Sequence, residues 1–238
     1  MAGHSKWANI KHKKERVDAK KGKIISRCAK EIISAVKQGG ADPKTNTKLR
    51  IALQKARNAN VSSDVIDRNI KKATSADQAD FTELTYELYG HGGVGIIVDA
   101  MTDNKNRTAS DMRIATNKKG GTIASPGSVA FNFDRKGVLQ MSKDQGDEET
   151  LFMQATEAGA EDFEVGDEGF IVVTAPDLLY EVKEKLEEKG VTIQDASLEM
   201  IPKTTVSCDQ ETKEANQGLL DFLENLDDVD GVFHNMED

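Results

Sequence analysis

The sequence predicts a multidomain protein that combines α and α+β domains. A helical bundle at the N-terminus precedes two α+β domains, one of which is ferredoxin-like and inserted in the other. Apolar residues recur every three or four positions before residue 77 and every second position from Phe81 onward. A β-α-β-β-α-β order then follows, and the charge changes from positive to negative along the chain. The length of 238 residues also favours more than one domain.

Three helices are predicted in a basic helical domain of residues 1–77. The first spans residues 17–38, because its apolar residues gather on one side at about 100° per residue, and a Gly-Gly pair ends it. The second begins near Thr45 or Asn46, and the Ser-Ser pair at 62–63 can cap the third. The apolar faces consist of Ile25, Cys28, Ala29, Ile32, Val36, Leu49, Ala52, Leu53, Ala56, Ile66, Ile70 and Ala73.

Residues 81–101 predict a β-hairpin, since two alternating segments, FTELTYELY and GVGIIVDAM, meet at a glycine-rich turn. A helix is expected over residues 108–117 and a strand over residues 129–133. Between these elements, residues 118–128 contain three glycines, one proline and few apolar side chains. We therefore expect a mobile, functional loop with few hydrogen bonds there.

The ferredoxin-like domain is predicted over residues 136–202. Its strands are expected at 138–141, 163–165, 170–174 and 192–198, and its helices at 148–158 and 177–189. The remaining residues predict a strand at TTVSC, a helix, and a strand at GVFHN. Three such elements cannot easily bury both of their faces alone, so we expect them to complete the sheet begun at Phe81. Residues 78–135 and 203–238 then form one discontinuous α+β domain.

The net charge of -9 averages segments of opposite sign. Residues 1–75 contain 19 Lys and Arg against 6 Asp and Glu, whereas residues 144–238 contain 5 basic and 27 acidic residues. A positive domain attracts polyanions by releasing their counterions, and an acidic domain repels them. Nucleic acid is therefore the expected partner, and it should meet the N-terminal part of the chain.

The basic N-terminal segment is the first candidate for nucleic-acid contact. Lysine and arginine neutralise phosphates without sequence preference. The ring of Trp7 can either stack on an unpaired base or anchor the segment against the bundle. The expected contact residues are Lys6, Trp7, Lys11, His12, Lys13, Lys14, Arg16, Lys20, Lys23, Arg27 and Lys30.

A second anionic contact is predicted at the segment TDNKNRT and the helix that follows it. The turn could hold a phosphate between helix N–H groups and the Arg107 guanidinium, or it could simply cap the helix. The residues of this second contact are Asn104, Lys105, Arg107, Arg113, Lys118 and Lys119.

The sequence has no pattern typical of a catalytic, metal or cofactor site. Its four histidines are scattered, and none lies beside a second ligand or a nucleophile that it could activate. Gly90, Gly92 and Gly95 match G-x-G-x-x-G, but a strand follows where a dinucleotide site requires a helix. We therefore expect no enzyme activity, no metal and no cofactor.

The sequence also favours a cytoplasmic protein without membrane contact. No apolar run approaches the roughly 18 residues of a membrane span, and the charged start lacks the apolar stretch of a signal peptide. Cys28 and Cys208 are too few for a disulfide scaffold, so each is expected to pack as a small apolar residue.

Several segments along the whole chain resemble the YebC/PmpR family, whose mitochondrial relative is the translational activator of cytochrome c oxidase I. They are AGHSKWANIKHKK, KQGGADPKTNTKLRIALQKARNANV, YGHGGVGIIVDAMTDNKNRT, GGTIASPGSVAFNF, EAGAED and LDDVDGVFHN. The resemblance implies a helical domain followed by two α+β domains, cytoplasmic action and no catalysis.

The resemblance also implies a DNA-binding transcriptional regulator. The alternative is a ribosome-associated factor that contacts ribosomal RNA and assists synthesis of proline-rich stretches. No clear helix-turn-helix is evident from the sequence. Backbone-driven contact with RNA is therefore as compatible with the residues as promoter readout.

Overall fold

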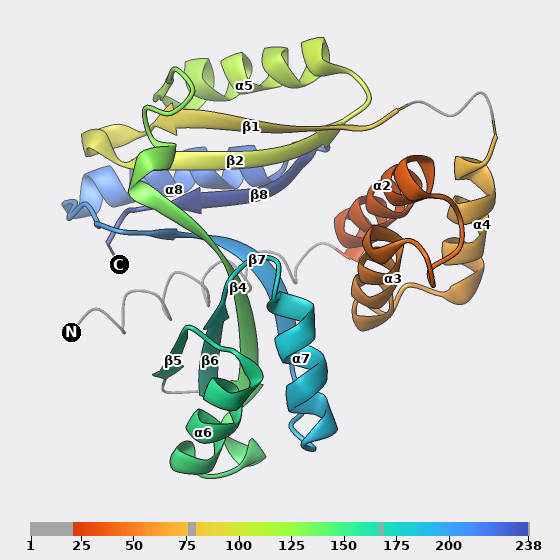
Figure 1. The fold of residues 1–238 in the computed structure, drawn as a ribbon. Coiled ribbons are helices and arrows are strands. Elements are labelled where there is room, and N and C mark those ends of the chain that lie inside the picture. Colours follow the sequence, from red (N-terminus) through yellow and green to blue (C-terminus); the bar gives the residue numbers. More distant parts are fainter. Residues whose placement is uncertain (1–20, 76–79, 167–168, 238) are drawn as a thin grey trace. The chain divides into compact units, whose positions relative to one another are not determined.

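The computed structural model describes residues 21–75, 80–166 and 169–237 (Figure 1). The chain divides into two compact units. The first unit contains the described residues up to Val129 together with Cys208–His234, and the second contains Ala130–Ser207 with residues 235–237. The predicted class is confirmed at the level of a mixed α/β protein with two antiparallel sheets.

The helices of the bundle in the first unit match the predicted ones closely. Their bounds are α2 (Lys21–Gly39), α3 (Thr47–Asn58) and α4 (Ser63–Ala73), and both α3 and α4 pack on α2. Asn46 is the N-cap of α3, because its side chain accepts a hydrogen bond from the Leu49 N–H at 3.1 Å. It also donates to the carbonyl of Ala35 at 2.8 Å, so one buried amide joins α3 to α2.

The close approach of the Asn46 side chain explains the glycine that ends α2. A Cβ atom at Gly39 would lie 2.7 Å from the Asn46 side chain, which leaves no room for another residue. Gly40 follows with a φ of +85°, a conformation that favours glycine. The Gly-Gly pair therefore both ends the helix and admits the Asn46 amide.

The sheet of the first unit has the strand order β3-β1-β2-β8, with every neighbouring pair antiparallel. The helices α5 (Lys105–Lys119) and α8 (Gln210–Glu224) pack against each other and on this sheet (Figure 1). The hairpin and the addition of a C-terminal strand were both predicted, and both are confirmed. The strands are β1 (Thr82–Tyr89), β2 (Gly95–Thr102), β3 (Thr122–Ile123) and β8 (Val229–His234).

The connection at 118–128 contradicts the prediction of few hydrogen bonds. Its strand β3 pairs with the end of β1. The buried Glu87 carboxylate, on β1, then accepts hydrogen bonds from the N–H groups of Gly127 at 2.5 Å and Val129 at 2.6 Å. One acidic side chain on β1 therefore supplies hydrogen bonds to this connection. The small number of apolar residues in the connection gave no sign of these bonds.

The second unit contains a sheet with the order β5-β6-β4-β7, again antiparallel throughout, with α6 (Glu148–Ala158) and α7 (Leu179–Glu188) on one face. Asp147 caps α6 by accepting from the Thr150 N–H at 2.9 Å. Buried apolar side chains such as Leu139, Leu151 and Leu186 join the helices to the sheet. The strands are β4 (Phe133–Ser142), β5 (Asp162–Val165), β6 (Gly169–Thr174) and β7 (Asp195–Pro202).

Two predicted strands are wrong. Where a strand was predicted over residues 129–133, Ala130–Asn132 form a short 3-10 helix and β4 begins only at Phe133, because the Val129 N–H is already bonded to Glu87. The segment TTVSC makes an isolated parallel bridge between Val206 and Met236 instead of a strand. Apolar alternation over so few residues did not distinguish a turn from a strand.

Candidate nucleic-acid interface

Most of the predicted N-terminal contact residues lie outside the described part of the chain. The structure describes Lys23, Arg27 and Lys30, all on α2. The residues outside it are Lys6, Trp7, Lys11, His12, Lys13, Lys14, Arg16 and Lys20.

Lys23 and Lys30 of α2 bond to the segment that joins α8 to β8. The Lys23 ammonium donates hydrogen bonds to the carbonyl oxygens of Glu224 and, at 2.6 Å, of Leu226. The Lys30 ammonium donates to the carbonyl oxygen of Asp227 at 2.8 Å. Carbonyl groups at a helix C-terminus carry partial negative charge, so the end of α8 attracts these cations. Both lysines therefore hold the bundle to the sheet.

Asp228 is the centre of a buried network within the first unit and is only 4% exposed. Its carboxylate accepts hydrogen bonds from Thr102 at 2.9 Å, Thr108 at 3.0 Å, and the Arg107 Nε at 3.0 Å and Nη2 at 2.8 Å. The Lys30 ammonium lies 3.2 Å from the same group. Burial by itself would raise the pKa of Asp228, but these donors hold that pKa below its usual value.

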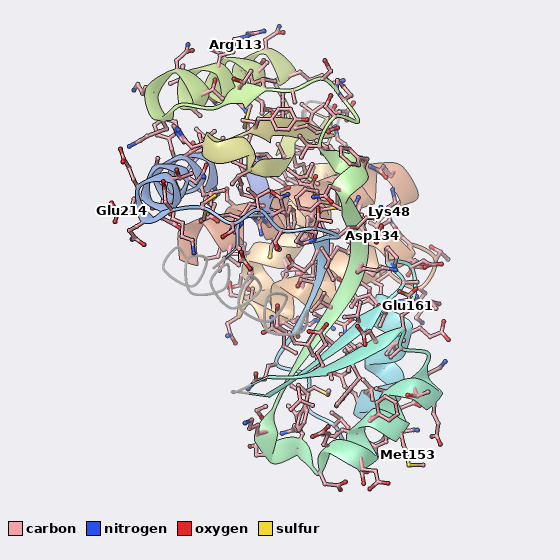
Figure 2. All side chains as sticks on the ribbon, turned by 90° about the vertical axis from the view of Figure 1, so that its left-hand side faces the viewer. Lys48, Arg113, Asp134, Met153, Glu161 and Glu214 are labelled. Atoms are coloured by element: carbon pink, nitrogen blue, oxygen red, sulfur yellow. The ribbon has the colours of Figure 1, made fainter. Side chains whose placement is uncertain are left out.

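Some residues of the predicted second contact bond within the protein, and others are exposed to solvent. Asn104 caps α5 by accepting from the N–H groups of Asn106 and Arg107, each at 3.1 Å, and the Arg107 side chain binds Asp228. The Lys118 ammonium lies 5.8 Å from the centroid of the Phe222 ring. The exposed members include Lys105, Arg113 and Lys119, and Figure 2 shows Arg113 projecting outward from α5.

Arg27, the third predicted contact residue that the structure describes on α2, also has an acidic neighbour. Its Nε lies 3.2 Å from a carboxylate oxygen of Asp230 on β8. Burial raises the pKa of Asp230 to about 6, even though the Arg27 guanidinium opposes the shift. Asp230 is therefore a group that titrates near neutral pH inside the first unit.

Replacement of Asp230 by Asn is expected to stabilise the protein more at pH 7 than at pH 4. The folded state binds this proton more tightly than the unfolded state, so the associated stability is present below the unfolded pKa and is lost as pH rises through about 6. Asp230→Asn removes this loss of stability, which is on the order of 3 kcal/mol at pH 7 for a pKa raised from 3.8 to about 6. Urea unfolding of both proteins from pH 4 to pH 7 measures the difference, and parallel stability profiles would contradict it.

A second group of cations lies on the connection before α3, on α3 and on α4, and sequence reasoning did not select it. These side chains are exposed, and none has an ion-pair partner among the described residues. They are Lys44, Arg50, Arg57, Arg68, Lys71 and Lys72, here called the α3–α4 cations.

The helical geometry could have indicated part of this group. Arg50 and Arg57 are seven residues apart on α3, so they lie on one flank about 20° from each other, beside the buried face that Leu49 and Ala56 form. Lys71 and Lys72 lie in the last turn of α4, where cations also complement the helix dipole. What the sequence could not show was that the α2 cations have internal partners.

Dispersed cations without carboxylate partners, such as the α3–α4 cations, can bind the phosphate backbone of a nucleic acid.

Within the described ranges, no three His, Cys, Asp or Glu side chains gather as metal ligands would. None of the described helices is long and apolar enough to cross a membrane.

The fold and this surface define a class: mixed α/β proteins with a cationic helical bundle and two antiparallel sheets. Within it, a family model for the TACO1/YebC protein N-terminal domain matches residues 5–76, and a model for the TACO1/YebC second and third domain matches residues 81–236. The chain belongs to the TACO1/YebC family, as its sequence motifs predicted.

Relatives match over essentially the whole chain. A "Probable transcriptional regulatory protein" of Protochlamydia amoebophila is 65% identical over 237 residues, which cover 100% of this chain and 97% of that protein. Another protein of that description, from Chlamydia pneumoniae, is 60% identical and covers 99% of this chain and 100% of its own. The crystal structure of a conserved hypothetical protein from Aquifex aeolicus has a TM-score of 0.83 at 43% identity, covering 93% of this chain and 92% of that one.

Proposed function

We propose that this protein is a non-enzymatic, nucleic-acid-binding regulator of gene expression that acts as a DNA-binding transcriptional regulator. The observation that carries the proposal is the set of α3–α4 cations, which are exposed and have no ion-pair partner among the described residues. The names of the relatives from Protochlamydia amoebophila and Chlamydia pneumoniae support a regulatory role. The proposed site includes the basic N-terminal segment, which continues the same positive charge in the sequence.

A ribosome-associated factor that binds ribosomal RNA and assists synthesis of proline-rich stretches is the second candidate. It is favoured by the distribution of the α3–α4 cations over two helices, which suits contact with a phosphate backbone. A recognition helix that reads bases would instead concentrate its contacts on one element.

The proposal includes a domain organisation and a location. Residues 1–77 form the basic helical domain, residues 78–135 and 203–238 form a discontinuous α+β domain, and residues 136–202 form a ferredoxin-like insertion. The strand order β5-β6-β4-β7 and the pairing of β8 with β2 support this division. We place the protein in the cytoplasm, where it works without a cofactor or membrane contact.

One experiment separates the two candidates. Tagged protein is expressed in cells and its binding is mapped on the genome, while the same lysate is fractionated on sucrose gradients at two salt concentrations. A DNA-binding regulator is expected to occupy discrete promoter sites and to remain at the top of the gradient. Salt-sensitive cosedimentation with ribosomes, without discrete promoter sites, would reject the first candidate in favour of the second.

A further inference from the structure

An apolar strip lies on the surface of the second unit, where α6 meets the edge strand β5. Phe152 and Met153 on α6 are 51% and 56% exposed, and Val165 on β5 is 45% exposed. Figure 2 shows Met153 at the outer side of α6. Among the described strands, β5 is at the edge of its sheet and pairs only with β6. We call Phe152, Met153, Phe163 and Val165 the α6–β5 patch.

Aromatic packing holds the patch in place. The Phe152 ring meets Phe163 edge-on, with centroids 5.8 Å apart, and Phe163 stacks on Phe170 at 5.5 Å. Phe170 is only 5% exposed and belongs to the core between the sheet and its helices. The rings therefore run from the core to the surface, so Phe152 is presented on a rigid support.

The surroundings of the patch are strongly acidic. Residues 147–166 contain seven acidic residues and no basic residue. Lys189 and Lys136 neutralise Glu157 and Glu161 at 2.5 Å and 2.6 Å. Glu148 and Glu149, one turn before Phe152, are exposed and have no cation partner among the described residues. Negative charge therefore remains next to the exposed ring.

We propose that the α6–β5 patch is a docking site for a basic, partly apolar segment of a partner protein. The apolar side chains supply the contact area, and the carboxylates of the first turn of α6 select positive charge. A second copy of the same patch would place Glu148 and Glu149 against the same carboxylates, which is unfavourable. Nucleic acids and anionic membranes are repelled for the same reason.

The test uses the full chain and a fluorescent amphipathic peptide of lysine and leucine, measured by anisotropy at about 0.15 M salt. Two control peptides replace all lysines by glutamate or all leucines by serine. The lysine-leucine peptide is expected to bind at least about tenfold more tightly than either control, because both charge and apolar contact are required. Glu148→Gln with Glu149→Gln is expected to weaken binding and to flatten its salt dependence.

Matched substitutions locate the site. Phe152→Ser with Val165→Ser is expected to weaken binding of the lysine-leucine peptide about tenfold or more, whereas Ile114→Ser, at a residue that is 40% exposed on α5, should leave it unchanged. Equal effects of the two substitutions, or equal affinity for the glutamate peptide, would overturn the proposal. So would dimers or binding to neutral lipid vesicles that Phe152→Ser abolishes, since the occupant would then be a second copy or a membrane.

Discussion

Replacing Arg50, Arg57, Arg68, Lys71 and Lys72 by glutamine is expected to reduce nucleic-acid affinity about 100-fold at about 0.1 M salt. Each of these cations is exposed and has no ion-pair partner among the described residues, so it can neutralise a phosphate without first breaking an internal bond. Titrations with duplex DNA and with a ribosomal RNA fragment at several salt concentrations measure the effect. The reduction should be similar for different base sequences, and the salt slope should become shallower by roughly one for each phosphate that is no longer neutralised.

The control for this experiment removes paired cations from the second unit. Lys136 and Lys189 lie 2.6 Å and 2.5 Å from Glu161 and Glu157, so their charges are already neutralised. Lys136→Gln with Lys189→Gln should change affinity less than about twofold. A lysine already paired with a carboxylate neutralises few phosphates, so it releases few counterions from the nucleic acid. If this variant weakened binding per charge as much as the α3–α4 variant, the α3–α4 cations would not be the interface.

Asp228→Ala is expected to lower the stability of the first unit by about 3 kcal/mol. The substitution leaves the buried Thr102 hydroxyl without its acceptor and leaves the Thr108 hydroxyl with only the Asn104 carbonyl, at 3.2 Å. It also takes the anion away from Arg107 and Lys30. Half of the Arg107 side chain is exposed, so water compensates part of that loss. Calorimetry of the full chain at pH 7 measures the shift in the transition of the first unit.

Asp227 supplies the matched control for Asp228. Its side chain is exposed, and only its backbone carbonyl binds Lys30. Asp227→Ala should therefore change stability by no more than about 0.5 kcal/mol. The pKa of Asp228 lies below its usual value, so its contribution is present at neutral pH and is lost as pH falls through the folded pKa. A destabilisation that did not diminish in acid would contradict the proposed role of the charge.

Local signals in the sequence were sufficient for most helices and for the β1–β2 hairpin of the first unit. The apolar spacing placed α3, α4 and α6 within one or two residues, because each helix buries one face against a core. The 3-10 helix at Ala130–Asn132 could not be predicted, since it follows a backbone N–H that is bonded to Glu87, 42 residues earlier in the chain.

The candidate site was harder to predict than the fold. A basic stripe on α2 was visible in the sequence, but the partners of Lys23, Arg27 and Lys30 lie about 200 residues later, at 224–230. No spacing rule connects such distant groups. The α3–α4 cations become apparent as the accessible group only after the α2 cations have been assigned to their internal partners.

The contacts between α2 and residues 224–230 set an order for folding during synthesis. The second unit is almost contiguous in sequence, so Ala130–Ser207 can form its core while the chain is still being made. The first unit must wait for α8 and β8, because β2 pairs with β8, and Lys23, Arg27 and Lys30 bond residues 224–230, which are made about 200 residues after α2. Until residues 224–230 have been made, the nascent protein therefore carries a basic helix that has not yet formed its contacts with that segment.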